Sequence, residues 1–130
     1  MGSYGKSVND YCWVYGDISN PAVFLYGPVS AIWEKPVFLD ELIKYLLNRQ
    51  YCVYIFDSVH LLKMSSSAKS QDALFEKIAE ATLSVAQCPA YMVCGYALGG
   101  TIALGIAKHL DSVERIVTFS GPGFICNNLR

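Results

Sequence analysis

The segment with the clearest chemical content is Gly95-x-Ala97-x-Gly99. A Gly-x-Ser-x-Gly sequence between a short buried strand and a helix holds a nucleophilic serine on a sharp turn. Residues 91–94 predict the strand and the small residues from Leu98 onward predict the helix, but the central residue is alanine. Because a methyl group cannot attack a carbonyl carbon, the sequence predicts the backbone of a nucleophile turn without its nucleophile.

The chain has only two histidines that could act as a base. His109 lies twelve residues beyond Ala97 on the same predicted helix, roughly 18 Å away, so we expect a surface residue at the helix C-terminus. His60 follows a predicted parallel strand, on the side where open α/β sheets bind ligands, and we expect a solvated loop histidine there. Asp57 ends that strand, and we interpret it as a cap of the following loop, with a ligand hydroxyl as its alternative partner.

Two further residues flank the turn. Cys94 is the last strand residue before Gly95, where we expect a buried and inert thiol. Tyr96 lies beside Ala97 and is interpreted either as a pocket wall or as a core aromatic. The five cysteines contain no Cys-x-x-Cys pair, so we expect reduced thiols, a cytoplasmic protein, no metal site and no cofactor.

The same glycines have a second interpretation. Gly95-x-Ala97-x-x-Gly100 is an imperfect dinucleotide-binding sequence after a strand, and a helix N-terminus can hold a phosphate. That site needs an acid at the end of the next strand, which here ends with Phe119 and Ser120. A nucleotide-binding module therefore remains the weakest of the hypotheses.

Charge and hydropathy argue against a nucleic-acid partner and against a membrane-spanning segment. The net charge of -1, with scattered lysines and arginines, predicts no nucleic-acid partner. Residues 88–107 form an uncharged run long enough to cross a bilayer. Pro89 and four glycines within this run favour a strand and a helix instead, so we expect no membrane contact.

Strand-like and helix-like segments alternate along all 130 residues. The first two predicted strands are interpreted as a hairpin or as neighbours, and a continuous apolar run predicts a strand buried on both faces. This order predicts an α/β fold, a three-layer αβα sandwich with a mostly parallel sheet. The expected strands are 11–15, 22–26, 52–56, 91–94 and 115–119, and the expected helices are 39–49, 71–87 and 98–109.

The last predicted strand, Arg115 to Phe119, has a further consequence. If it ends the sheet, its unpaired edge invites a second copy of the chain or another protein. We therefore expect a homo-oligomer or a protein partner at this strand, or a chain that is a fragment.

These elements together resemble the N-terminal half of an α/β-hydrolase-fold protein over residues 11–121. Residues 22–27 resemble the third strand of that fold with its His-Gly, although Tyr26 replaces the histidine. Phe56-Asp57 resembles the start of a glycine-rich loop, but residues 58–63 contain no glycine. Residues 113–117 resemble the sixth strand.

The resemblance implies specific roles for residues near the turn. The first oxyanion donor would be the backbone N–H of Leu98, and the second would come from Pro28, which has no N–H, or from Val29. The candidate pocket residues are Tyr26, Gly27, Pro28, Asp57, His60, Tyr96 and Ala97.

The resemblance also places the acid, the catalytic histidine, the lid and the later strands beyond Arg130, so residues 1–130 would form one incomplete domain. The leading hypothesis is a pseudoenzyme that binds a protein or a small apolar ligand over Ala97. The alternative is a fragment or knockout of a carboxylic-ester-type serine hydrolase.

Overall fold

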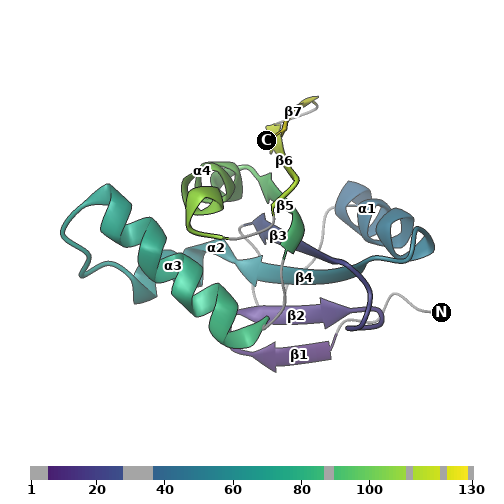
Figure 1. The fold of residues 1–130 in the computed structure, drawn as a ribbon, viewed down its shortest axis with the longest axis horizontal. Helices are drawn as coiled ribbons and strands as arrows, with labels where there is room; N and C mark the ends of the chain where they lie inside the picture. The colour runs from purple at the N-terminus through teal and green to yellow at the C-terminus, as the bar shows by residue number, and fades with distance from the viewer. Residues whose placement is uncertain (1–5, 28–36, 87–89, 111–112, 121–122, 129–130) are drawn as a thin grey trace.

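The computed structural model describes residues 6–27, 37–86, 90–110, 113–120 and 123–128 (Figure 1). Seven strands form one sheet in the order β1-β2-β4-β3-β5-β6-β7. The strands are β1 (Lys6–Asn9), β2 (Cys12–Tyr15), β3 (Ala22–Gly27), β4 (Cys52–Asp57), β5 (Ala90–Tyr96), β6 (Arg115–Ser120) and β7 (Gly123–Asn128). The helices are α1 (Val37–Asn48), α2 (Ser58–Met64), α3 (Gln71–Val85), α4 (Leu98–Ile106) and the 3-10 turn η1 (Ala107–His109).

The four central strands, β4, β3, β5 and β6, run parallel to one another. Antiparallel strands flank them, with β1 and β2 on one side and β7 on the other. Parallel neighbours need helical crossovers, and these cover both faces of the sheet. The predicted α/β class and its three layers are confirmed.

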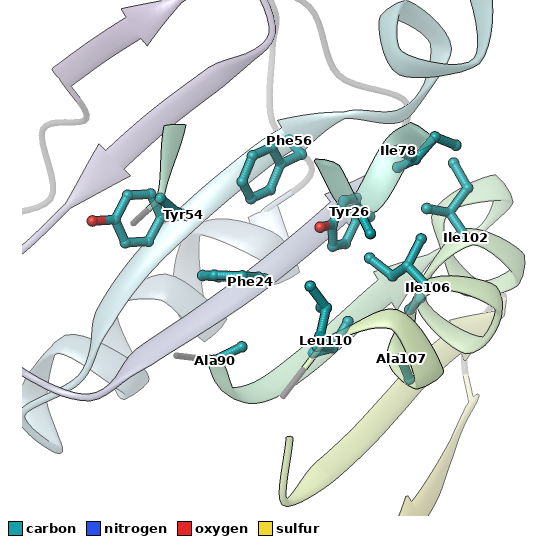
Figure 2. Packing of buried hydrophobic residues seen from close by; sticks show 14 of the residues in the cluster. Phe24, Tyr26, Tyr54, Phe56, Ile78, Ala90, Ile102, Ile106, Ala107 and Leu110 are labelled. Carbon is teal, nitrogen blue, oxygen red and sulfur yellow. The ribbon is translucent and has the colours of Figure 1, made fainter. Parts of the chain in front are cut away.

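Alternation along each central strand divides the core into two layers. In β3, Val23 and Leu25 face α1, where they pack with Leu39 and Ile43. Phe24 and Tyr26 face the opposite layer, where α2, α3 and α4 lie (Figure 1). Figure 2 shows this second layer, and its labelled residues are Phe24, Tyr26, Tyr54, Phe56, Ile78, Ala90, Ile102, Ile106, Ala107 and Leu110.

The expectation that the first two predicted strands form a hairpin or lie next to each other in the sheet is wrong. Strand β4 lies between β2 and β3, pairing antiparallel with β2 and parallel with β3. The hairpin partner of β2 is β1, a strand that the sequence did not predict. Strand β4 is wholly buried, so the backbone groups on both of its edges need hydrogen-bond partners. Its position between β2 and β3 provides them.

Two further expectations are corrected. Residues 58–64 form helix α2 rather than a loop, since Asp57 supplies a side-chain cap for it. Arg115 to Phe119 is not the sheet edge, because β7 pairs antiparallel with β6 over its whole length. The expected partner at an open β6 edge therefore loses its structural basis.

The uncharged run at residues 88–107 contains the whole of β5 and of α4. Among the described helices, none combines the length and the apolar character that crossing a membrane requires.

Candidate functional site

The turn between β5 and α4 has the backbone geometry of a strained nucleophile turn. Ala97 lies between the two elements with φ 54° and ψ -120°. This left-handed backbone is rare for a residue with a side chain and costs about 1–3 kcal/mol, so it persists only where the surroundings enforce it. Ala97 is nevertheless exposed to solvent.

Glycines on both sides of Ala97 enforce this geometry. A Cβ atom on Gly95 would collide with the carbonyl oxygen of Gly99, and a Cβ atom on Gly99 would collide with the carbonyl oxygen of Tyr26. Helix α4 therefore lies in direct backbone contact with β3 and β5. Because the α4 backbone lies so close to these two strands, the chain can pass from β5 into α4 only through a sharp turn.

The N-terminus of α4 presents a backbone donor at the surface. Ala97 makes no side-chain cap, and the Gly100 N–H donates to the Ala97 carbonyl oxygen at 2.9 Å. Leu98 is the first helical residue, so no carbonyl of the helix itself can accept from its N–H. Its side chain is 43% exposed. The other proposed oxyanion donor, Val29, and its neighbour Pro28 lie outside the described residues.

Four of the candidate pocket residues meet at the carboxyl edge of the sheet. Gly27 is level with Asp57 in the parallel register, and a Cβ atom on Gly27 would lie 3.5 Å from the ring of Tyr96. The half-buried Tyr96 precedes Ala97 directly. The register thus brings Gly27, Asp57 and the Tyr96-Ala97 turn to one edge.

Asp57 uses its carboxylate within the chain. Oδ1 accepts from the N–H groups of Val59 at 3.0 Å and His60 at 3.2 Å, and the side chain is buried. An N-cap of this kind satisfies donors that the first helical turn leaves free. The interpretation of Asp57 as a cap is confirmed, although what it caps is helix α2.

Tyr26 belongs to the core rather than to the surface of the turn. Its side chain is fully buried and stacks on Phe56, with ring centroids 4.9 Å apart (Figure 2). Its hydroxyl lies 2.7 Å from Thr82 Oγ1, and Thr82 donates to the Ile78 carbonyl oxygen at 2.9 Å. Since the single Thr82 proton is used there, Tyr26 is the donor to Thr82. Burial raises the pKa of Tyr26 far above its usual range.

The two histidines have ring partners other than the residues of the Ala97 turn. His60 is a half-buried residue of α2, not a loop residue, and its ring packs on Tyr11 with centroids 5.5 Å apart. Tyr11 directly precedes β2, whereas Ala97 follows β5, and strands β4 and β3 separate β2 from β5. His109 ends η1, as expected at the helix C-terminus, and its Nε2 lies 3.3 Å from a carboxylate oxygen of Asp72.

The cysteines that the structure describes with their side chains are buried and form no disulfide bond with one another, as expected: Cys12, Cys52 and Cys94. Desolvation, together with the nearby Cys52, raises the pKa of the Cys12 thiol to about 12. No group of three or more metal-ligating side chains occurs within the described ranges.

The hydrogen bond between Tyr26 and Thr82 could not be predicted from the sequence. Thr82 is a buried residue in the last turn of α3, and its spacing alone indicates only a buried face. Its role as the acceptor for Tyr26 depends on the packing of α3 over β3, which a single sequence does not specify.

Comparisons with solved structures identify the fold. A dienelactone hydrolase-like promiscuous phosphotriesterase from metagenomic libraries superposes with a TM-score of 0.60 at 17% identity, over 93% of this chain and 61% of that one. A thermostable carboxyl esterase from Bacillus coagulans gives a TM-score of 0.53 at 16% identity, over 89% of this chain and 43% of that one.

The chain has the α/β-hydrolase fold. A third α/β-hydrolase structure, the thioesterase domain from the curacin biosynthetic pathway, gives a TM-score of 0.52 at 16% identity, over 79% of this chain and 38% of that domain. The chain thus spans less than two thirds of the length of each of these neighbours. No family model matches the sequence, and no curated protein is similar to it in sequence.

Proposed function

We propose that this α/β-hydrolase-fold protein is non-catalytic and binds a small apolar ligand over the Ala97 turn. The observation that carries the proposal is the turn itself, which keeps a strained and exposed backbone at Ala97 although its methyl group has no nucleophilic chemistry. The strain positions the Leu98 N–H at the surface, where it can donate to a ligand oxygen.

The surroundings of the turn favour an apolar ligand. The Leu98 side chain is 43% exposed and the neighbouring Tyr96 ring is half-buried, so apolar surface flanks the free N–H. Asp57 lies at the same edge but is committed to capping α2. An apolar molecule with one carbonyl oxygen matches this combination of surface and donor, and an apolar protein segment is the other occupant that the same surface allows.

The placement of the histidines argues against ester hydrolysis by residues 1–130. A serine nucleophile needs a base within hydrogen-bond reach. His60 packs on Tyr11 at the β2 side of the sheet, and His109 interacts with Asp72 at the far end of α4.

A second hypothesis is a fragment or knockout of a carboxylic-ester-type serine hydrolase. It is supported by the esterase and thioesterase among the structural neighbours and by the partial coverage of both. The nucleotide-binding hypothesis has the weakest support, since β6 ends at Ser120 without an acid. Titration with NAD or ATP tests that hypothesis, and saturable binding below about 1 mM would revive it.

Amide NMR of the full chain tests ligand binding directly, with butyrophenone as an apolar ketone probe. The proposal predicts saturable shifts at Tyr96, Ala97 and Leu98. Leu98→Asp should weaken binding at least about tenfold, because it places a charge beside the donor. Leu104→Asp is the matched control, since Leu104 is a comparably exposed leucine of the same helix, at 50%.

Equal binding by the two variants would show that the probe does not use the turn. The absence of saturable shifts at all three amides would refute an apolar carbonyl ligand at this site.

A further inference from the structure

Tyrosine and arginine side chains gather at the amino edge of the sheet, opposite the carboxyl edge that carries the candidate site. Tyr51 directly precedes β4, Tyr91 is the second residue of β5, and Arg115 begins β6. Since these strands are parallel, their amino ends meet at one edge. Tyr45 in the last turn of α1 and Arg49 directly after α1 complete the group. We propose that these residues form a tyrosine-arginine surface that binds an acidic peptide segment of a protein partner.

Two ring contacts organise the tyrosine-arginine surface. The rings of Tyr51 and Tyr91 are stacked, with centroids 5.5 Å apart and planes inclined by 23°. The Arg49 guanidinium lies over the Tyr45 ring, 4.7 Å from its centroid. Tyr45 is 53% exposed, and the two stacked tyrosines are half-buried. The surface therefore offers ring area to a partner, and tyrosine and arginine are among the residue types that contribute most to binding at protein interfaces.

The turn that leads from α1 into β4 fixes Tyr51 relative to Arg49. The Tyr51 N–H donates to the Leu46 carbonyl oxygen at 3.1 Å. The Gln50 N–H donates to the Leu47 carbonyl oxygen, also at 3.1 Å, and Gln50 has a left-handed backbone with φ 68°. Two hydrogen bonds of this pattern around a left-handed residue make the Schellman ending of a helix. A partner would therefore meet a backbone that is already ordered, which reduces the entropy cost of binding.

The strand register brings the second arginine to the stacked tyrosines. Arg115 is level with Met92 in the parallel pairing of β5 and β6, so it lies one position along from Tyr91. The Glu114 N–H donates to the Tyr91 carbonyl oxygen at 2.8 Å, which holds the start of β6 against β5. Arg115 is exposed at this point. Its guanidinium is therefore available to a partner beside the stacked rings.

The charge of the tyrosine-arginine surface favours an acidic partner. Burial and the other hydroxyl of the stacked pair raise the pKa of Tyr51, whereas the positive charges of Arg115 and Arg49 lower it, so both guanidinium groups act on the same hydroxyl. Neither arginine forms an ion pair with the described residues. Guanidinium groups bind carboxylates through paired, charge-assisted hydrogen bonds. Two such groups beside one ring pair thus match a segment that carries several carboxylates.

A nucleic-acid strand is the other class of partner that arginines and aromatic rings bind. Such a strand needs a row of positive charges that follows its phosphates, and the net charge of this chain is -1. An acidic peptide needs only carboxylates placed at the two guanidinium groups. The surface therefore fits the peptide better.

Amide NMR of the full chain in about 20 mM salt tests the proposal with separate probes. They are the blocked peptide Glu-Glu-Phe-Glu-Glu, its glutamine counterpart Gln-Gln-Phe-Gln-Gln, and a short oligothymidylate. The glutamate peptide should give saturable shifts at Arg49, Tyr51, Tyr91 and Arg115 with a Kd of about 1 mM. The glutamine peptide should bind at least about fivefold more weakly, and about 200 mM salt should weaken the glutamate peptide at least about threefold.

Substitutions of the arginines test which groups bind the carboxylates. Arg115→Gln and Arg49→Gln should each weaken binding of the glutamate peptide about threefold, and the double variant about tenfold. Lys63→Gln is the matched control, because it removes the same charge from an exposed lysine of α2, which follows the opposite end of β4. It should change binding less than about 1.5-fold. Thermal melting verifies that each variant is folded, as its exposed position predicts.

The proposal fails if the glutamate peptide gives no saturable shifts at these amides or if the two peptides bind equally. Equal effects of Arg115→Gln and Lys63→Gln would also overturn it, because binding would then follow net charge rather than this surface. Tighter binding of the oligothymidylate than of the glutamate peptide would assign the surface to nucleic acid and exclude the acidic segment as its partner.

Discussion

Replacing Ala97 with glycine is expected to stabilise the protein, although glycine substitutions usually destabilise folded chains. The reason is the backbone of the turn, where Ala97 has φ 54° and ψ -120°. Only glycine adopts this region without a steric cost, because it has no Cβ atom. The Ala97 side chain is exposed, so its removal leaves no cavity.

The magnitude follows from two opposing terms. Relief of the strain contributes about 1–3 kcal/mol, and the added freedom of glycine in the unfolded chain removes about 0.4–1 kcal/mol. The net gain is about 1 kcal/mol, which for a chain of 130 residues raises Tm by about 4 °C.

Urea denaturation of three variants measures this effect. Ala97→Ser keeps a Cβ atom and should leave the free energy of unfolding nearly unchanged. Ala81→Gly, in the interior of α3, is the control for ordinary helical backbone and should lose about 1 kcal/mol. If Ala97→Gly destabilises the protein as much as Ala81→Gly, Ala97 is not strained and the geometric argument for the turn fails.

Three other predictions concern the core and the helix contact. Tyr26→Phe and Thr82→Val should each lower the free energy of unfolding by about 1–3 kcal/mol, and a double-mutant cycle should show a coupling of about 1 kcal/mol; additive losses would exclude the buried hydrogen bond. Gly99→Ala should cost about 3 kcal/mol or more in urea denaturation, because the new Cβ atom meets backbone. Gly100→Ala should cost far less, since its Cβ atom would lie 3.4 Å from the Thr118 side chain, and similar losses would refute this packing. The free energy of unfolding should fall between pH 9 and pH 12, by up to about 1.4 kcal/mol per pH unit. In this range the Cys12 thiol ionises in the unfolded chain. In the folded protein it stays protonated, because its pKa is raised to about 12. Cys12→Ala should flatten this dependence, and an unchanged slope would assign it to other groups.

Most of the fold could be predicted because its signals are local. The continuous apolar run of β4 and the glycine spacing around Ala97 are properties of short segments. They indicate a strand buried on both faces and a sharp strand-to-helix turn without any knowledge of the rest of the chain.

The predictions that are wrong concern which strands pair with each other in the sheet. The pairing of β2 with β4 rather than with β3 is a contact between distant segments, and no local pattern specifies it. Helix α2 was missed because a serine-rich stretch directly follows it, although Asp57 before Ser58 is a capping signal that was available. The same holds for the candidate site. The turn at Ala97 could be predicted from a local pattern, whereas the burial of Tyr26 against Thr82 is a contact between distant segments and could not.

The central proposal is that residues 1–130 keep the strand-to-helix turn of the α/β-hydrolase fold but do not hydrolyse esters. Hydrolysis of p-nitrophenyl butyrate by purified Ala97→Ser tests it most directly, with wild type and heat-denatured variant as blanks. We expect no turnover above the wild-type rate, because both imidazoles have other partners, His60 on the Tyr11 ring and His109 beside Asp72. Saturable hydrolysis by Ala97→Ser that is lost on His60→Ala would contradict the account and establish the chain as a serine hydrolase with a single missing atom.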